Sequence, residues 1–396
     1  MRKAYLDHSA TAPVLPEVRD AMLPYLGDKF GNPSSLHDWG DPAREAIDAA
    51  RSQVATLVGA SDPEEVIFTA SGTESNNFAI KGIAMAQQSK GKHIVISAIE
   101  HFSVMNSAKA LEKMGFEVTL VPVDKFGIVN PEDVSKSLRQ DTILVSIMQA
   151  NGEVGTIEPI REIAKITKER KIVFHTDAVA TCGTIPVNVK ELGVDVLSLA
   201  GNQFYGPKGS GALWVRRGVR IVPLLEGGIQ EGGRRAGTED VPAIVGMGKA
   251  AEIAVKELSG RIARLIPMRD KLLTRMPDKV GHVIVTGHPQ NRLPGHASFC
   301  VEFIEGESML MMLNAQGIAV SSGSSCTSRA LKASHVLLAM GYSHEIAQGS
   351  LLFTIGIENS IEDIDYVIEV MPSLVDRLRQ MSPLYAKFVK AGKGGQ

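Results

Sequence analysis

The residue of this chain best suited to chemistry is Cys326, in the serine- and glycine-rich stretch SSGSSCTSRALKASH (321–335). Its small neighbours predict an exposed thiol, and Arg329 and Lys332 would favour the thiolate form. Because such a thiol is readily modified, a reactive cysteine is the preferred interpretation, and an incidental loop cysteine is the alternative.

The other two cysteines give no sign of a shared site. Cys182, Cys300 and Cys326 are too few and too scattered for a disulfide framework or a CxxC zinc motif. Cys300 lies in the apolar run SFCVEF and is predicted to be a core residue. Cys182 follows the strand that contains Asp177, and its role is left open by the sequence.

A second candidate is Lys208, in the segment SLAGNQFYGPKGSGAL (198–213). This segment is the end of a buried strand, a turn rich in Gly, Pro and Asn, and the start of another strand. Such strand ends are where α/β enzymes often place their chemistry. The segment alone leaves open whether Lys208 is a catalytic amine or a structural residue of the turn.

Polar side chains follow three other predicted strands. Thr73 is placed to cap a helix whose first turn would suit a phosphate, although a capped helix without a ligand fits equally well. Asp177 would pair with a protonated ring nitrogen or a metal, or simply cap the next helix. His101 fits a hydrogen-bonded surface histidine, and no second His or Cys stands at zinc-ligand spacing.

The elements that must position these residues alternate between strands and helices from about 40 to 260. Amphipathic stretches such as 42–59 predict helices between apolar strands, which implies a mainly parallel seven-stranded sheet covered on both faces. Ligands then gather at the carboxyl ends of the strands. The predicted strands are EVIFTA (65–70), HIVISAI (93–99), FEVTLVPV (116–123), TILVSIM (142–148), IVFHTDA (172–178), VDVLSLA (194–200) and GALWVRR (211–217).

After about 260 the pattern changes to a long helix and four short apolar runs, which predict a smaller α+β domain. We therefore expect a large α/β domain over 16–260 and a small domain over 261–390 that carries Cys326. The N-terminal segment 1–15 is expected to pack with the small domain.

Composition excludes several function classes. The 396 residues are 44% hydrophobic and 22% charged, as in ordinary globular proteins, and their net charge is −2. The chain has no basic block of the kind that would indicate a nucleic-acid or membrane partner. The start MRKAYLDHSA is too polar for a signal peptide. A cytoplasmic location is expected.

Nine motifs occur in order along the whole chain, and together they resemble the NifS/IscS-type cysteine desulfurases, which belong to the fold-type I group of pyridoxal-phosphate enzymes. The resemblance implies the aminotransferase-like fold and a homodimer with active sites near the interface. The motifs are YLDHSATAPV, GNPSSLHDWG, SGTESNN, the pair Glu100–His101, NGEVGT, HTDAV, FYGPKGSGAL, RRAGTED and SSGSSCTS.

The family's chemistry implies a role for Cys326. In these enzymes a lysine holds pyridoxal phosphate as a Schiff base, and the cofactor acts as an electron sink for bound cysteine. A loop cysteine attacks the substrate sulfur, which leaves alanine and a persulfide. The sulfur then passes to acceptors, commonly an iron–sulfur scaffold protein. By motif position Cys326 would be the persulfide cysteine.

The same resemblance implies the residues around pyridoxal phosphate. His101 would stack on the pyridine ring, Asp177 would face its nitrogen, and Thr73 would bind the phosphate. Asn151, in the NGEVGT motif, would also contact the cofactor. Thr238, in RRAGT, would reach the phosphate across a dimer interface.

This sequence departs from the family pattern where the lysine should stand. The pattern resembles SAHKFYGPKG, whereas the chain reads AGNQFYGPKG, so the Schiff-base lysine falls on Gln203. Lys208 matches a second lysine of the pattern and is not a relocated catalytic amine. An amide is not nucleophilic and cannot shuttle the α-proton. The phosphate-binding serine and histidine of the pattern fall on Ala200 and Asn202.

Three further departures involve the same expected pocket. Ala180 replaces a glutamine next to the cofactor's phenolic oxygen, and Gly152 replaces an asparagine. Leu352 replaces the arginine that clamps the substrate carboxylate, a bidentate pair worth about 1.5–3 kcal/mol or more. The cysteine motif itself still fits the family pattern.

Two hypotheses follow. In the preferred one, the chain is a dimeric sulfur-transfer or assembly partner in which Cys326 accepts sulfur or ligates a nascent iron–sulfur cluster shared with a partner. In the alternative, it is a cysteine desulfurase with non-covalently bound pyridoxal phosphate and severely depressed turnover. A third possibility is that the emptied pocket binds another ligand, for which the sequence names no candidate.

Overall fold

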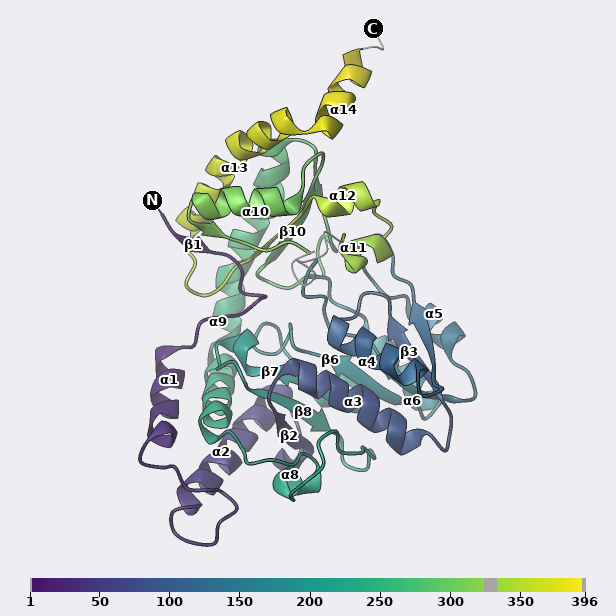
Figure 1. The fold of residues 1–396 in the computed structure, drawn as a ribbon, viewed down its shortest axis with the longest axis vertical. Helices are drawn as coiled ribbons and strands as arrows, with labels where there is room; N and C mark the ends of the chain where they lie inside the picture. Colours follow the sequence, from purple (N-terminus) through teal and green to yellow (C-terminus); the bar gives the residue numbers. More distant parts are fainter. Residues whose placement is uncertain (1, 324–332, 394–396) are drawn as a thin grey trace.

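The computed structural model describes residues 2–323 and 333–393. It has two lobes, a large one built on a seven-stranded sheet and a smaller one that contains both the N-terminal strand and the last helix (Figure 1). The 40-residue helix α9 (Val241–Val280) runs from the first lobe into the second.

All seven predicted strands are confirmed and form one sheet in the order β2-β8-β7-β6-β5-β3-β4. Only β8 is antiparallel to its neighbours, because a short turn joins it to β7 where the other connections contain helices. The strands are β2 (Val66–Thr69), β3 (His93–Ser97), β4 (Glu117–Val121), β5 (Thr142–Ser146), β6 (Val173–Asp177), β7 (Val196–Ala200) and β8 (Gly211–Val215).

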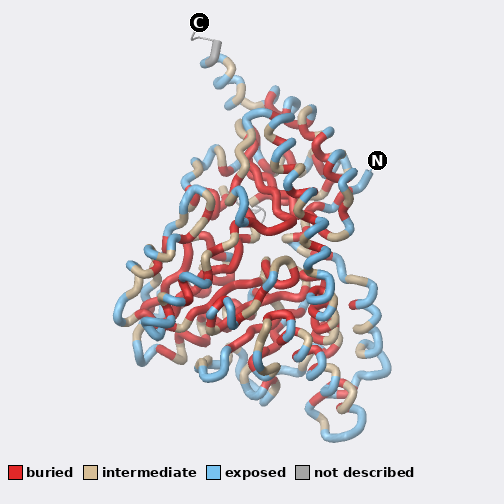
Figure 2. The backbone as a smooth tube through the Cα atoms, turned by 180° about the vertical axis from the view of Figure 1, so that it is seen from behind, coloured by how far each residue is buried: buried red, intermediate tan, exposed pale blue. Residues whose placement is uncertain are grey.

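Helices cover both faces of this sheet. α3 (Gly72–Gln87) and α4 (Phe102–Glu112) pack on one face, and α2 (Asp41–Val58), α6 (Ile160–Glu169) and the start of α9 pack on the other. Two apolar cores therefore lie on either side of the strands, whose residues are almost all buried except in the edge strand β4 (Figure 2). The shorter helices here are α1 (Pro16–Met22), α5 (Pro131–Ser137), α7 (Val189–Leu192), α8 (Gln230–Gly233) and the 3-10 turns η1 (Leu23–Leu26), η2 (Pro63–Glu65) and η3 (Gly201–Phe204).

The smaller lobe is an antiparallel sheet, in the order β12-β10-β9, packed against helices. Its strands are β9 (Val283–Val285), β10 (His296–Val301) and β12 (Ser350–Thr354). Its helices are α10 (Gly306–Ala315), α11 (His335–Ala339), α12 (His344–Gln348), α13 (Ile361–Met381) and α14 (Pro383–Lys393).

The N-terminal residues lie against the smaller lobe. β1 (Ala4–Tyr5) pairs in parallel with β11 (Ile318–Ala319), and Leu6 belongs to the same apolar core as α13. The boundary predicted at 260/261 falls inside α9, which is continuous there, and the domain limits stay predictions. Among the described residues, no helix is long and apolar enough to cross a membrane.

Candidate functional site

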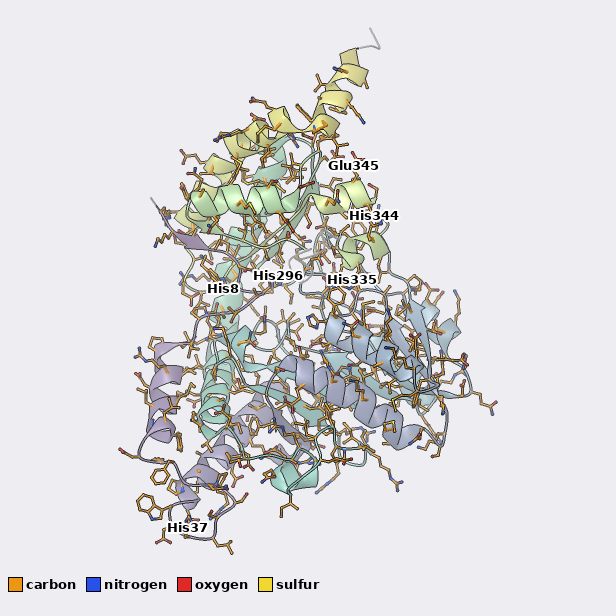
Figure 3. The ribbon with its side chains drawn as sticks, viewed as in Figure 1. His8, His37, His296, His335, His344 and Glu345 are labelled. Carbon is orange, nitrogen blue, oxygen red and sulfur yellow. The ribbon has the colours of Figure 1, made fainter. Side chains whose placement is uncertain are left out.

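A cavity of about 400 Å³ lies between the two lobes. Its floor consists of the residues that follow β2, β3, β5, β6 and β7, so it stands at the carboxyl ends of the parallel strands, as predicted. The smaller lobe forms the other wall with His296, His335, Leu352 and the segment 321–323. Figure 3 shows His296 and His335 in this band between the lobes.

Asp177 ends β6 at this cavity and is rigidly held. Its Oδ2 accepts a hydrogen bond from Asn76 Nδ2 at 2.6 Å, and its Oδ1 accepts one from the Val179 amide at 2.9 Å. Burial raises the pKa of this carboxyl, although His101 and the two hydrogen bonds oppose the shift. A carboxylate so placed suits a cationic or N–H-bearing group in the cavity.

His101 lies on the cavity wall at the start of α4. Its Nδ1 accepts a hydrogen bond from the Ser103 amide at 3.1 Å and also contacts Ser103 Oγ at 2.7 Å. Because an amide donates to Nδ1, a neutral ring carries its proton on Nε2. The prediction of an exposed, hydrogen-bonded histidine is confirmed, and its ring is fixed at the edge of the cavity.

The prediction that Thr73 caps a helix is wrong. The N-cap of α3 is Ser71, whose side chain accepts a hydrogen bond from the Glu74 amide at 3.1 Å. Ser71 is the last residue with extended backbone, whereas Thr73 already lies within the helix, so the cap stands two positions earlier than expected. Thr73 is exposed and lines the cavity.

Gln203 also lines the cavity, from the turn that follows β7. Its side-chain amide donates a hydrogen bond to the Ser9 carbonyl at 2.9 Å, which ties this turn to the N-terminal segment. Tyr205 ends the turn with a left-handed backbone (φ 71°). At the position where the resemblance predicts the Schiff-base lysine, the structure therefore has a hydrogen-bonded, non-titratable side chain.

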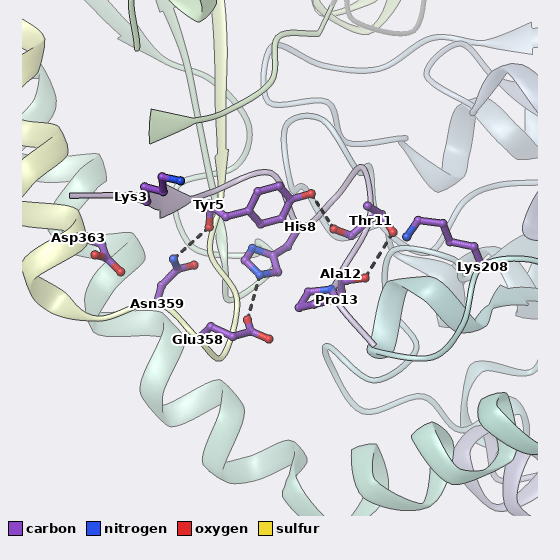
Figure 4. A pocket seen from close by; sticks show the side chains of 10 residues that line it. All are labelled: Lys3, Tyr5, His8, Thr11, Ala12, Pro13, Lys208, Glu358, Asn359 and Asp363. Atoms are coloured by element: carbon purple, nitrogen blue, oxygen red, sulfur yellow. Dashed lines mark hydrogen bonds and ion pairs between the residues drawn. The ribbon is translucent and has the colours of Figure 1, made fainter. Parts of the chain in front are cut away.

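Lys208 belongs to a different cavity. It is exposed and lines a second hollow of about 530 Å³, together with the N-terminal segment and the start of α13 (Figure 4). Within that hollow His8 Nε2 lies 3.1 Å from Glu358 Oε2. Lys208 does not line the cavity that contains Gln203 and Asp177, so its amine is not placed to replace the missing lysine.

The ionisable groups that the described residues contribute to the first cavity are all carboxyl or imidazole groups. Among the described residues that line it there is no Lys or Arg. Its ionisable side chains are Glu100, Glu153, Asp177, His101, His296 and His335. Within the described part of the chain, a phosphate or a substrate carboxylate would thus meet no permanent cation in this cavity.

Glu100 is the most deeply buried of these groups. Its Oε1 accepts hydrogen bonds from Ser97 Oγ at 2.6 Å and from the Met148 amide at 2.8 Å, but its Oε2 is buried without a partner in the part of the chain described. Burial raises the pKa of Glu100 to about 8, so the carboxyl is mostly protonated at neutral pH. Burial likewise lowers the pKa of His296 to about 3.

Asn151 lines the cavity, but its side chain holds the local turn together. Its Oδ1 accepts hydrogen bonds from the amides of Glu153 (2.9 Å) and Val154 (3.0 Å), and its Nδ2 donates to the Ile99 carbonyl at 3.1 Å. A cofactor contact of Asn151 stays a prediction.

Thr238 is exposed and is not among the residues that line the cavity. Its segment is nevertheless anchored beside α3, because Arg235 Nε donates to Glu74 Oε1 at 2.9 Å. A contact of Thr238 across a dimer interface stays a prediction. Cys326 lies outside the described residues, as do Arg329 and Lys332.

Comparisons with known proteins agree with this geometry. Residues 4–367 match the aminotransferase class-V family. A cysteine desulfurase IscS of Dictyoglomus turgidum is 50% identical over 96% of this chain and 97% of its own, and one of Methanosarcina thermophila is 51% identical over 98% and 95%. The solved structure of a NifS-like protein superposes with a TM-score of 0.90 at 37% identity, over 95% of this chain and all of the other.

The chain belongs to the NifS/IscS-type cysteine desulfurase family. The fold-type I architecture predicted from the motifs is thereby confirmed. All six departures from the family pattern line the one cavity, although they are spread over 200 positions of sequence: Gly152, Ala180, Ala200, Asn202, Gln203 and Leu352. Gln203 and Leu352, at the positions where the resemblance predicts a lysine and an arginine, both line this cavity.

Sequence reasoning missed the buried acids of the site. Glu100 and Glu153 were visible only as members of family motifs, because nothing in one sequence shows that a glutamate is buried. The burial of Cys300 is confirmed, and Cys182 is buried as well.

Proposed function

We propose that this protein is a sulfur-transfer or assembly partner for iron–sulfur cluster or thio-cofactor formation, and that its amino-acid chemistry with pyridoxal phosphate has been lost. The observation that carries the proposal is the concentration of all six departures in one cavity with no Lys or Arg among its described residues. A single substitution would leave most of the catalytic set intact, whereas these remove the amine, the clamp and the phosphate ligands together.

The cavity fits part of pyridoxal phosphate. Asp177 would accept a hydrogen bond from the ring nitrogen, His101 would lie against the ring, and the free amides at the start of α3 would face the phosphate. Gln203 offers no amine for the aldehyde, and Leu352 offers no charge for a substrate carboxylate. When bound, the cofactor supplies an electron sink for bond cleavage at an amino acid's α-carbon.

The proposed chemistry needs only a thiolate. The sulfur of Cys326 would attack the outer sulfur of a persulfide donor, form a new sulfur–sulfur bond and release the donor's thiolate. An acceptor thiolate would then take the same sulfur and leave Cys326 as the thiolate again. In the cluster variant, Cys326 would donate a thiolate ligand to a cluster shared with a scaffold protein. We place this activity in a cytoplasmic homodimer.

A second candidate is an active cysteine desulfurase that binds pyridoxal phosphate without a covalent link. It is supported by the presence of Asp177, His101 and Thr73 in the cavity and by relatives named cysteine desulfurase. The missing lysine and arginine argue for negligible release of alanine from free cysteine.

An absorption spectrum and a mass spectrum separate the two candidates. We expect purified protein mixed with pyridoxal phosphate to show no band of lysine-bound cofactor and to release negligible alanine from cysteine. After treatment with a persulfide donor, the mass of Cys326 should rise by one sulfur atom. Alanine release comparable to that of a lysine-bearing desulfurase, or the absence of sulfur on Cys326 together with the absence of a bound cluster, would contradict the proposal.

A further inference from the structure

The side-chain amide of Gln203 has a fixed orientation at the cavity between the lobes. Its Nε2 donates to the Ser9 carbonyl at 2.9 Å, and a carbonyl can only accept, so the nitrogen must be the atom on that side. Ser9 is itself fixed, because its amide donates to Thr354 Oγ1 at 2.9 Å. Within residues 2–323 and 333–393 no donor contacts Gln203 Oε1, which leaves this oxygen as an acceptor for an occupant of the cavity.

A second acceptor faces the same cavity from the neighbouring strand. Asp177 ends β6 and pairs there with Ser198 of β7, the strand that leads into the turn with Gln203. The carboxyl of Asp177 is held by its hydrogen bonds from Asn76 and from the Val179 amide. Both acceptors therefore belong to the large lobe and are positioned by adjacent elements. A ligand that contacts both must carry two hydrogen-bond donors.

Small apolar side chains form the wall next to these acceptors. A Cβ on Gly72 would stand 2.7 Å from Val179 Cγ2 and 3.3 Å from Ala200 Cβ, so these three residues pack closely at the cavity floor. A Cβ on Gly152 would stand 3.8 Å from Ala180 Cβ, so two small residues face each other there. Such a wall suits the face of a ring, and a cavity of about 400 Å³ is large enough for a small cyclic molecule.

Two buried polar groups on the cavity wall have no partner. Glu100 Oε2 and both ring nitrogens of His296 are buried without a hydrogen bond in the described part of the chain. Glu100 is 0% exposed and His296 is 8% exposed, and both line the cavity. Because a buried polar atom without a partner is costly, these groups indicate a polar occupant and not an apolar one.

We propose that the cavity binds a ring that has a basic nitrogen and an exocyclic amine, the chemistry of pyridoxamine 5'-phosphate. Asp177 would accept a hydrogen bond from the ring N–H, and Gln203 Oε1 would accept one from the amine. An aldehyde in place of the amine offers no donor to Gln203 Oε1. The glutamine thus selects an amine, whereas a lysine at this position would select an aldehyde. This inference goes beyond the proposed function and does not involve Cys326.

The first test measures binding to the purified protein by isothermal titration calorimetry. The two ligands are pyridoxamine 5'-phosphate and 4-deoxypyridoxine 5'-phosphate, in which a methyl group replaces the aminomethyl group. Because they share the ring and the phosphate, the ratio of their dissociation constants reports the amine alone. The parent should bind the amine about tenfold more tightly, as expected for one charge-assisted hydrogen bond. Equal affinities, or no binding of the amine at millimolar concentration, would overturn the proposal.

The second test repeats both titrations with three variants whose folding is checked by urea unfolding. Gln203→Leu removes the acceptor and should bring the ratio close to one. Asp177→Asn should weaken both ligands by a similar factor, because its carboxyl contacts the ring and not the amine. Lys208→Gln, in the other hollow, is the matched control and should change neither affinity. A tenfold ratio that persists in Gln203→Leu, or unchanged binding in Asp177→Asn, would contradict the proposal.

The outcome of these titrations is separate from sulfur transfer. If the amine binds as expected but Cys326 never carries sulfur or a cluster, the proposed function fails while the amine site stands. If Cys326 carries sulfur and the amine does not bind, only the amine site is refuted.

Discussion

The two walls of the cavity have changed to different extents. The large-lobe wall carries five of the departures from the family pattern, from Gly152 to Gln203, whereas the small-lobe wall carries only Leu352. At Leu352 the main-chain pairing is present. The Leu352 amide donates to the Ser321 carbonyl at 2.8 Å, and the Ser321 amide donates to the Leu352 carbonyl at 3.2 Å.

This difference shows that side-chain chemistry and backbone framework are separable. Ala200 still pairs with Gly211 in the sheet, and Leu352 still pairs with Ser321 and Ser298, since these bonds involve only the main chain. Gln203 and Leu352 thus differ from the family pattern only in their side chains, while the strands β7 and β12 beside them keep their main-chain pairing. The comparison predicts that function now depends on the small-lobe wall.

The largest expected effect is that of Cys326→Ala. If Cys326 carries the function, this variant should lose sulfur carriage and cluster support completely, because the other two cysteines, Cys182 and Cys300, are buried. The measurement is sulfur transfer to an acceptor protein, followed by mass spectrometry. Gln203→Ala is the matched control and should transfer sulfur as the parent does. If Cys326→Ala transferred sulfur as well as the parent does, Cys326 would not carry the function.

The next effect concerns the buried acid of the large-lobe wall. The pKa of Glu100 is raised to about 8, so the folded state holds a proton that the unfolded state releases near its ordinary value of 4.5. The stability of the parent should therefore decline as the pH rises from about 4.5 to 8, and Glu100→Gln should remove up to about 3–5 kcal/mol of that decline.

Urea unfolding of the parent and Glu100→Gln across this pH range measures the Glu100 effect. The informative quantity is how the difference in unfolding free energy between the parent and Glu100→Gln changes with pH. The difference at any single pH also contains the constant cost of replacing the carboxyl by an amide. Glu153→Gln should give a similar but smaller change, since the pKa of Glu153 is raised only to about 7. A difference that does not vary with pH would show that Glu100 is ionised in the folded protein.

A smaller effect is expected at the support of Asp177. Asn76→Ala removes the 2.6 Å hydrogen bond to Asp177 Oδ2 and should cost about 1.5–3 kcal/mol, as for a bond to a buried carboxylate. The pKa of Asp177 should rise further, so the loss should be larger at high pH than at low pH. Asn76→Asp is the contrasting variant, because it places a second acid against the first. If Asn76→Ala lowers the unfolding free energy by less than a substitution of an exposed polar residue does, the hydrogen bond to Asp177 does not stabilise the large-lobe wall.

Much of this architecture could be predicted from sequence, for physical reasons that differ by element. Six of the seven strands were predicted because strands covered on both faces are nearly continuous apolar runs, and the edge strand β4 because its residues still alternate with Val and Leu. The carboxyl ends of the strands located the site residues Asp177 and His101. The cap at Ser71 was misplaced because S-G-T offers two hydroxyls, and only the backbone angles decide between them. The contact between Glu153 and Ser334 joins positions 181 residues apart, and no local pattern encodes such a distance.

The smallest effect should come from the position that defines the family's chemistry. Gln203 makes one hydrogen bond, to the Ser9 carbonyl, and is half-buried, so Gln203→Ala should cost about 0.5–1.5 kcal/mol of unfolding free energy. Gln203→Glu should cost more, because a carboxylate would face the same carbonyl without a donor. Urea titration measures both variants, and sulfur transfer at matched folded fractions completes the test. If Gln203→Ala lowers transfer by far more than it lowers stability, Gln203 takes part in the chemistry and the large-lobe wall is still functional.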